Sequence, residues 1–364
     1  MKNILLILWL LTSLGVHAQE NTGTKGELSS PFTISGYAEG YYSVDLNNSM
    51  NHKKPSFFVN HNKNDEVSLN LAFIKGSYDT ENIRANLALG LGSYMRTNYA
   101  AESSLLKNLY EGNIGVLLLK ENNVWLDVGI FTSHIGFENA IGKEHFNLTR
   151  SMQGENTPYF EAGTKISSTS NDGKLFLSAL ILSGWQRIQP LDGNTLPAFG
   201  TQITYKPSSR VTLNSSTFIG TDKPDNTRKM RYLHNFYAFL DLQNGWDAIV
   251  GFDIGAEQKD LNSSAMNIWF NPTLVLRYEL TEKAAIAVRT EYYNDKNGVI
   301  IASGTPNGFK TWGFSTNFDY HITKNLIWRI EARALTSKDK VFGRHNGNTA
   351  DTNTFLTTAL AINF

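Results

Sequence analysis

The sequence predicts an all-β protein, a transmembrane antiparallel up-and-down β-barrel of 16 strands. Three observations lead to this fold class. Segments of roughly 10–14 residues, rich in β-branched and aromatic residues, follow one another from Phe32 to Phe364, separated by clusters of Gly, Asn, Asp, Ser and Pro. The connections between these segments alternate strictly between short and long. Within the segments, apolar and polar residues alternate with the period of a strand.

The first residues predict export. A basic start (MKN), an apolar core (ILLILWLL) and a small-x-small cleavage site (VHA) precede Gln19, and this combination is typical of a secretory signal peptide. We therefore expect a cleaved signal peptide at residues 1–18, an N-terminal periplasmic segment at 19–31 and a β-barrel at 32–364.

Composition narrows the class of protein further. Lys and Arg together number 33, as do Asp and Glu, so the chain has no net field that would attract nucleic acid. There is no cysteine, so an exported chain of this size must be stabilised by a large core or by closed backbone pairing. After residue 18 no apolar run approaches the length of a transmembrane helix.

The connections give the strand count. Seven are tight turns, at 79–82, 120–123, 170–173, 206–209, 241–245, 280–283 and 322–325. Eight are long loops, at 47–65, 95–108, 134–157, 186–196, 221–230, 259–265, 296–308 and 338–351. Fifteen connections join sixteen strands, with both chain ends on the short-turn side. Short turns on one rim and long loops on the other are typical of outer-membrane barrels, with the short turns in the periplasm.

Alternation assigns the two faces of each strand. In one segment, Trp328 and Ile330 point one way while Arg329 and Glu331 point the other. A soluble β-sandwich would show the same alternation, but two features favour a barrel. The apolar fraction is modest, at 41%, and aromatic residues collect at strand ends, as in the girdles at membrane interfaces. The expected girdle residues are Trp125, Trp185, Trp246, Trp269, Trp312, Trp328, Tyr205, Tyr278 and Tyr320.

The connection at 134–157 carries charged residues among apolar ones. Folding into the lumen would let its apolar residues pack on the wall and present its charges to a channel. Opposed charges in a narrow pore favour polar solutes, although the wall charges could equally be ion pairs that tie neighbouring strands together. The residues expected at the constriction are Glu138, Lys143, Glu144 and Arg150 from this loop, with Glu39, Arg84, Asp127, Arg277, Arg289, Glu291, Arg329, Glu331 and Arg333 from the wall.

Enzyme signatures are weak. GTPNGFKT (304–311) has the residue types of a phosphate loop but not its spacing, and neither a G-x-S-x-G nor an H-E-x-x-H motif occurs. The histidines are scattered without ligand spacing, so we expect no metal, no cofactor and no catalytic residues. Two alternatives stay open: an outer-membrane barrel hydrolase, and a secreted soluble β-protein that binds glycans through surface aromatics.

The sequence resembles the OmpL-like β-barrel porins of Gram-negative bacteria of the Bacteroidota type. The resemblance runs through FTISGYAEGYYSVD (32–45), SFFVNHNKNDEVSLNLAFIKGSYD (56–79), WLDVGIFTSHIGFENA (125–140), NTPYFEAGTK (156–165) and the terminal ALAINF. It implies an outer-membrane porin with a water-filled channel for passive diffusion of small polar solutes or ions. It carries over no catalytic residue and names no solute.

The resemblance also implies a role for the last residue. A barrel has no free edge, so the final strand pairs with the first, and we expect Phe364 to face lipid on that strand. Its terminal aromatic ring resembles the C-terminal signal that outer-membrane barrels present to the barrel-assembly machinery. The expected partners are therefore outer-membrane lipid, the assembly machinery and small polar solutes, with a homo-oligomer left open and no nucleic acid.

Overall fold

The computed structural model describes residues 30–47, 52–345 and 347–364, and Phe32–Phe364 form one compact unit. The expected signal peptide and nearly all of the expected periplasmic segment lie outside the described residues. No helix in the described part of the chain is long and apolar enough to cross a membrane.

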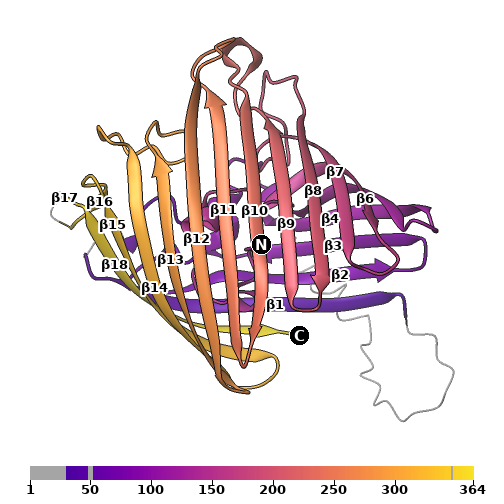
Figure 1. Ribbon diagram of the computed structural model, residues 1–364, viewed down its shortest axis with the longest axis horizontal. Helices are drawn as coiled ribbons and strands as arrows, with labels where there is room; N and C mark the ends of the chain where they lie inside the picture. Colours follow the sequence, from indigo (N-terminus) through magenta and orange to yellow (C-terminus); the bar gives the residue numbers. More distant parts are fainter. Residues whose placement is uncertain (1–29, 48–51, 346) are drawn as a thin grey trace, which may run out of the picture. The chain divides into compact units, whose positions relative to one another are not determined.

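Sixteen antiparallel strands close into one barrel, which confirms the predicted fold class and strand number (Figure 1). Each strand pairs with its neighbours in sequence, and β18 closes the barrel between β15 and β1. The barrel strands are β1 (Phe32–Asp45), β2 (Val67–Asp79), β3 (Ile83–Leu91), β4 (Leu109–Leu119), β5 (Val124–Thr132), β6 (Phe160–Thr169), β7 (Leu175–Leu182), β8 (Ala198–Ser208), β9 (Val211–Gly220), β10 (Arg231–Gln243), β11 (Trp246–Gln258), β12 (Met266–Thr281), β13 (Ala284–Asp295), β14 (Phe309–His321), β15 (Leu326–Ser337) and β18 (Thr352–Asn363).

The short turns and long connections fall where the sequence predicts them. In the β10–β11 turn, Gln243, Asn244 and Gly245 all have positive φ, a conformation that Gly and Asn tolerate best. The long connections hold the other elements of the described residues: α2 (Ser93–Asn98), η2 (Leu106–Asn108), η3 (Gly142–Glu144), α3 (Met152–Glu155), η4 (Asp225–Thr227) and the small sheet of β16 (Phe342–Gly343) with β17 (Thr349–Ala350). Strand length varies more than the sequence suggests, from eight residues in β7 to sixteen in β12.

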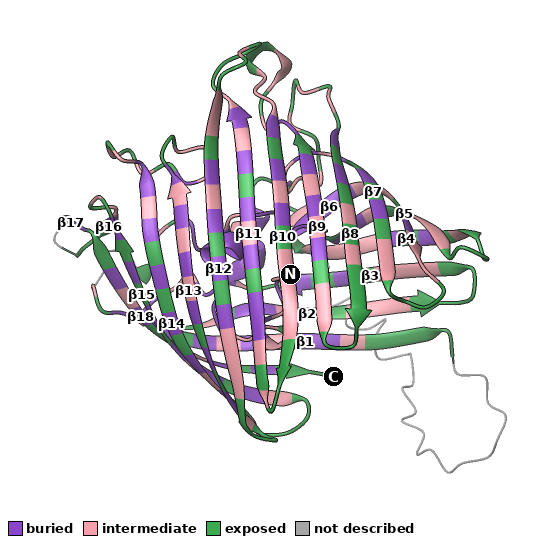
Figure 2. Ribbon diagram, in the orientation of Figure 1, coloured by how far each residue is buried: buried purple, intermediate pink, exposed green. Residues whose placement is uncertain are grey.

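Burial alternates along the strands, as the bands in Figure 2 show. In β15, Arg329, Glu331 and Arg333 point inward and are fully buried, while Trp328 on the opposite face is exposed. A soluble sandwich would bury its apolar face, but here the exposed face is the apolar one. Leu, Ile and Val on that outer surface meet the hydrocarbon of a bilayer.

The chain ends at the seam of the barrel. Gly36 N donates to Phe364 O at 2.9 Å, and Phe364 N donates to Gly36 O at 3.1 Å. The Phe364 ring lies over Gly36, so closely that a β-carbon at position 36 would approach the ring to 2.2 Å. Phe364 is 64% exposed and lies on the outer face of the seam. The last residue therefore extends the β1–β18 pairing by one step.

Deleting Phe364 removes both of these backbone hydrogen bonds. At about 0.5–1.5 kcal/mol each, we expect the free energy of unfolding to fall by about 1–3 kcal/mol. Urea titration of the micelle-folded barrel, with the folded fraction measured on unboiled gels, gives this value. The control, Phe364→Leu, retains both bonds and should lose less than about 1 kcal/mol. An equal loss in both variants would show that the ring, and not the backbone pairing, stabilises the seam.

Candidate functional site

The connection between β5 and β6, residues 133–159, runs inside the barrel, and we call it the lumenal loop. Its Gln153 Nε2 donates to Asp253 Oδ1 on β11 at 2.7 Å. Farther along the lumen, Lys143 Nζ donates to Lys324 O at 2.9 Å in the short turn between β14 and β15. The loop thus enters at the long-loop end and reaches the short-turn rim.

Arginines on the wall bind the backbone carbonyls of the lumenal loop. Arg329 donates to Gly142 O at 2.6 Å and to His145 O at 2.7 Å. In the same way, Arg289 Nη1 donates to Thr149 O at 2.6 Å, and Arg333 Nη1 to Arg150 O at 2.7 Å. Each guanidinium supplies several donors in a fixed plane, which suits a segment whose only secondary structure is two short helical turns.

Acceptors on the same wall bind the loop's backbone N–H groups. Thr149 N donates to Glu331 Oε2 at 2.6 Å, and Leu148 N donates to Asn317 Oδ1 at 3.0 Å. Met152 N donates to Glu291 Oε2. Donors and acceptors from β13, β14 and β15 therefore alternate along the loop, and we call this set the wall ladder: Arg289, Glu291, Asn317, Arg329, Glu331 and Arg333.

The charged members of the wall ladder are buried and paired, four of them among themselves and Arg329 with Asp319 on β14. Arg289 Nη2 lies 2.9 Å from Glu331 Oε1, Arg333 Nη2 lies 2.6 Å from Glu291 Oε1, and Arg329 Nε lies 2.7 Å from Asp319 Oδ1. The expectation that these residues line an open constriction is wrong, because the loop covers them. This correction applies to Arg289, Glu291, Arg329, Glu331 and Arg333.

The side chains of two expected constriction residues of the loop itself are also buried. Arg150 donates to Asn139 O at 2.7 Å and to Ala140 O at 2.9 Å, which folds the loop back on itself. Glu138 accepts from Ser151 N at 2.9 Å. Burial raises the pKa of the Glu138 carboxyl, and the nearby Arg289 opposes this rise. Neither Glu138 nor Arg150 presents its charge to water, so the expectation is wrong for both.

Glu39 on β1 contacts a second inward-folding segment, residues 52–66. It is fully buried, and its Oε1 lies 3.1 Å from His61 Nε2. Val59 N in the same segment donates to Glu155 Oε2 of the lumenal loop at 2.7 Å, so the two loops are joined. Burial raises the pKa of Glu155 to about 7. Glu39 is therefore a structural contact, not a constriction residue as expected.

This second inward loop was missed in the sequence, although the signal that identified the first was present. Phe57 and Phe58 form an apolar pair within a long polar connection, and both are buried in the structure. His61 of this loop was not singled out either, and nor were Glu155 of the lumenal loop or Asn317 and Asp319 on the wall. They lie far apart in sequence and meet only through the fold.

Charged residues that reach water lie mainly on the opposite wall. Arg84 binds Asp127 through two hydrogen bonds of 2.7 and 2.6 Å. The side chains of Arg84, Lys75 and Lys165 are 31%, 25% and 22% exposed, respectively. Because they point into a closed barrel, the water they meet is that of the lumen. Asp127 is nearly buried beneath Arg84.

The remaining expected constriction residues lie at the short-turn end. Arg277 is 18% exposed and pairs with Asp247 and Glu279, each at 2.9 Å. Lys143 is half-buried, and Glu144 is exposed. These residues, with Arg84, are the expected constriction residues whose side chains meet solvent.

Six of the nine expected girdle residues lie on the outer face of the barrel, among them Trp246 and Tyr278, whose ring centroids are 4.7 Å apart. The six are Trp246, Trp312, Trp328, Tyr205, Tyr278 and Tyr320.

The other three expected girdle residues point inward, so their assignment is wrong. Trp269 is 2% exposed and packs over Gly255, where a β-carbon would lie 2.0 Å from the indole ring. Trp185 packs against Phe218, with ring centroids 4.9 Å apart. The guanidinium of Arg84 lies 4.3 Å from the ring centroid of Trp125, inside the barrel.

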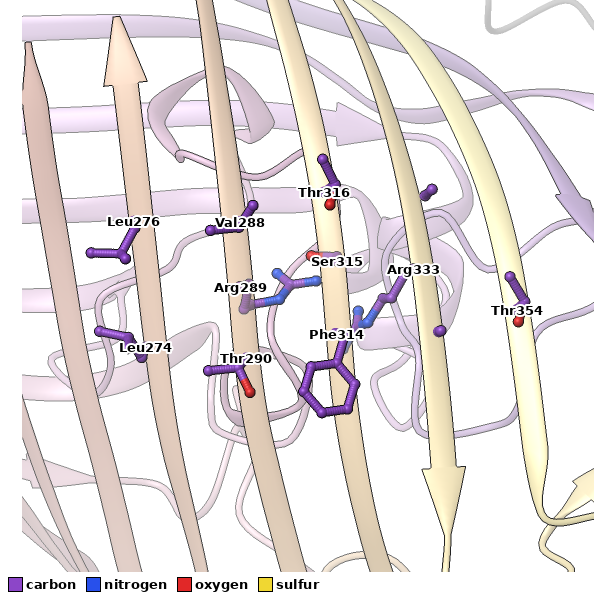
Figure 3. A pocket seen from close by; sticks show the side chains of 12 residues that line it. Leu274, Leu276, Val288, Arg289, Thr290, Phe314, Ser315, Thr316, Arg333 and Thr354 are labelled. Atoms are coloured by element: carbon purple, nitrogen blue, oxygen red, sulfur yellow. The ribbon is translucent and has the colours of Figure 1, made fainter.

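A shallow depression lies on the outer, lipid-facing surface of the barrel, on the other side of the strands from the polar interior. Figure 3 shows Leu274, Thr290 and Phe314 on its surface, while Arg289 and Arg333 extend behind the strands. Its outward-facing side chains are aliphatic, aromatic or threonine, so it is a lipid contact and not a polar site. Among the described residues, no group of three or more His, Asp or Glu is placed to hold a metal ion.

Comparison with solved structures shows the same fold in bacterial porins. The anion-selective porin from Comamonas acidovorans is 7% identical, with a TM-score of 0.60 over 92% of this chain and 99% of that one. In-vitro-folded OmpT of Vibrio cholerae is 8% identical, with a TM-score of 0.57 over 94% and 100%. Salmonella typhi OmpF, in a complex with daunomycin, is 10% identical, with a TM-score of 0.57 over 92% and 97%.

At these identities the structural similarity shows the fold alone. Comparison with curated proteins gives no match to the chain. The family model of the beta-barrel porin-2, OmpL-like proteins, however, matches residues 31–364, which is the whole barrel. The chain therefore belongs to this OmpL-like porin family and is an outer-membrane channel protein.

Proposed function

We propose that the protein is a passive diffusion channel for small polar solutes, and that its conducting space lies beside the lumenal loop. The observation that carries this proposal is the one-sided packing of the lumen. The wall ladder on β13–β15 is buried beneath the loop, whereas Lys75, Arg84 and Lys165 on β2, β3 and β6 meet water. A barrel of sixteen strands is wide enough to hold both a loop and an aqueous path.

Most of the charges along this path are paired, although Lys165 shares Asp127 with Arg84, at 4.0 Å from that carboxylate. Lys75 lies 2.7 Å from Glu111, and Arg84 lies 2.6 Å from Asp127. Paired charges give a polar surface without a strong field of one sign. We therefore propose that polar solutes of either charge pass, and that strong ion selectivity does not arise on this wall.

The long-loop end of the lumen carries a hydrophobic layer, which we propose sets the size limit. Its buried side chains come from strand ends around most of the barrel and from both inward loops. Its members include Phe57, Phe58, Ile135, Met152, Phe218, Leu233, Trp269, Phe309 and Phe355. Passage then requires some of these side chains to move apart.

The membrane and assembly contacts complete the proposal. The six outward Trp and Tyr residues would form the lipid girdle, and Phe364 would serve as the signal to the barrel-assembly machinery. A trimer is described for one solved structure similar to this chain, OmpT of Vibrio cholerae, which favours a homo-oligomer here.

The enzyme alternative has one specific observation behind it. Ser215 Oγ lies 2.8 Å from His234 Nε2 on the lipid-facing side of β9 and β10. A nucleophile–base pair also needs a group that orients the base, and the hydrogen bonds of the described residues give His234 no carboxylate or amide partner. The channel is therefore the better-supported function.

The channel proposal predicts ionic current. Micelle-folded protein added to a planar lipid bilayer should give discrete conductance steps, because a polar path runs along the uncovered wall. Folding is checked beforehand on a detergent gel, where unboiled and boiled samples should migrate differently. A correctly folded barrel without any current would favour the enzyme, while a protein that is soluble without detergent and shows one unchanged band would favour the glycan-binding alternative.

A second prediction concerns the wall ladder. Arg329→Met removes two bonds to loop carbonyls, each worth about 1.5–3 kcal/mol. Their sum is about 3–6 kcal/mol, so amide hydrogen exchange of residues 142–149 should accelerate by about a hundredfold or more, and single-channel conductance should change as the loop loosens.

Arg84→Met is the matched control. Arg84 and Arg329 both point inward and both fork onto an aspartate, but Arg84 has no hydrogen bond to the lumenal loop. Exchange in residues 142–149 should stay unchanged in this variant. Equal acceleration in both variants would mean that the barrel as a whole has loosened and that the ladder does not hold the loop.

A further inference from the structure

A polar cavity of about 380 Å³ lies at the long-loop end of the barrel. Its walls are residues 53–57 of the first long connection, residues 301–303, the β16–β17 segment and the inner face of β18. The volume is within the range of pockets that hold small organic ligands. It is separate from the lumenal loop, none of whose residues line it.

The charge of this cavity has one sign. Of its sixteen lining residues, Lys53, Lys54 and Arg344 are basic and none is acidic. The polar groups beside them are hydroxyls and amides, from Ser56, Ser303, Thr349, Asn348 and Asn353. This lining contrasts with the paired charges elsewhere in the lumen. Its positive charge and its hydrogen-bonding groups are complementary to an anion.

Lys54 is the most confined of the three cations. Only 7% of its surface is exposed, and its Nζ lies 3.2 Å from Thr357 Oγ1. The ring of Phe355, 4.9 Å away, stabilises the ammonium group but offers no hydrogen-bond acceptor. No carboxylate among the described residues is within ion-pair distance of it. Burial lowers the pKa of Lys54 to about 7, and Arg333 adds to this effect, whereas the carboxylates of Glu331, Glu155 and Asp45 oppose it.

Asn353 on β18 provides an independent observation. It is 1% exposed and lines the cavity, yet within the described part of the chain neither its side-chain oxygen nor its nitrogen has a hydrogen-bond partner. Buried amides are nearly always paired, since an unmet polar group inside a protein is costly. A polar ligand in the cavity would supply the missing partners.

We propose that this cavity binds a small soluble organic anion, one whose phosphate or carboxylate is held by Lys54 and Arg344 and whose polar body meets Asn353. The cavity lies against the inner face of β14 and β18, where Phe309 and Asn353 are buried, and not against the lipid-facing surface, so a solute and not a membrane lipid is the occupant. The site goes beyond diffusion through the channel, because it gives the long-loop mouth a preference for anions that the wall of paired charges lacks.

Calorimetric titration of the micelle-folded barrel tests the proposal, with glucose 6-phosphate as the anionic probe and glucose as its neutral counterpart. Binding of glucose 6-phosphate, with glucose at least about tenfold weaker, is expected. Lys54→Met retains the packing against Phe355 and should weaken the binding of glucose 6-phosphate by about tenfold or more. Arg344→Ala should weaken this binding by about threefold or more.

Lys340→Ala is the matched control, since it removes a positive charge from the same connection as Arg344 without touching the cavity. The affinity of this variant for glucose 6-phosphate should stay within about twofold of that of the unaltered protein. The proposal is overturned if glucose binds as tightly as glucose 6-phosphate or if neither binds. It is also overturned if Lys340→Ala lowers the affinity for glucose 6-phosphate as much as Arg344→Ala does. The titration does not depend on conductance, so binding can be measured even if the barrel carries no current. If the barrel conducts but does not bind glucose 6-phosphate, the anion site is refuted and the channel proposal stands.

Discussion

The structure depends on one constraint: an irregular segment inside a closed barrel must find partners for its backbone N–H and C=O groups. The backbone groups of the strands pair with one another in the wall, so beyond the few bonds within the loop's own short turns the remaining partners are side chains. The wall ladder meets this need, with arginines for carbonyls and Glu291, Asn317 and Glu331 for amides. The path of the lumenal loop, the burial of the wall charges and the one-sided lumen all follow from it.

The same constraint explains why the ladder uses arginine. Arg329 donates to both oxygens of Asp319 and to two loop carbonyls at once. Lysine has three donors on one atom and could not span these partners from a fixed plane. A buried ion pair alone contributes little to stability, because the desolvation cost offsets the attraction. Here the Arg329–Asp319 pair contributes to stability through the additional hydrogen bonds of Arg329, which hold the loop against the wall.

Much of the fold could be predicted because side chains along a strand alternate between its two faces and because tight turns have a characteristic amino-acid composition. The same rule could have corrected two errors. Asp127 was assigned to the lumen and Trp125 to lipid, but residues two apart share a face. Trp269, eight residues before the inward Arg277, shares its face in the same way. The covering of the wall ladder could not be predicted, since Arg329 and Gly142 are distant in sequence and Arg84 has the same local pattern without a loop above it.

The two ends of the lumen differ in the kind of contact that fills them, and this difference decides where the proposed channel can open. The lumenal loop is held by short, directional, charge-assisted bonds that weaken steeply when atoms shift. The layer around Phe57, Phe309 and Phe355 is held by ring packing, which tolerates sliding, with Phe57 and Phe309 centroids 4.9 Å apart. Opening for a solute therefore costs less at the long-loop layer than along the ladder. The ladder shapes the path, and the aromatic layer admits the solute to it.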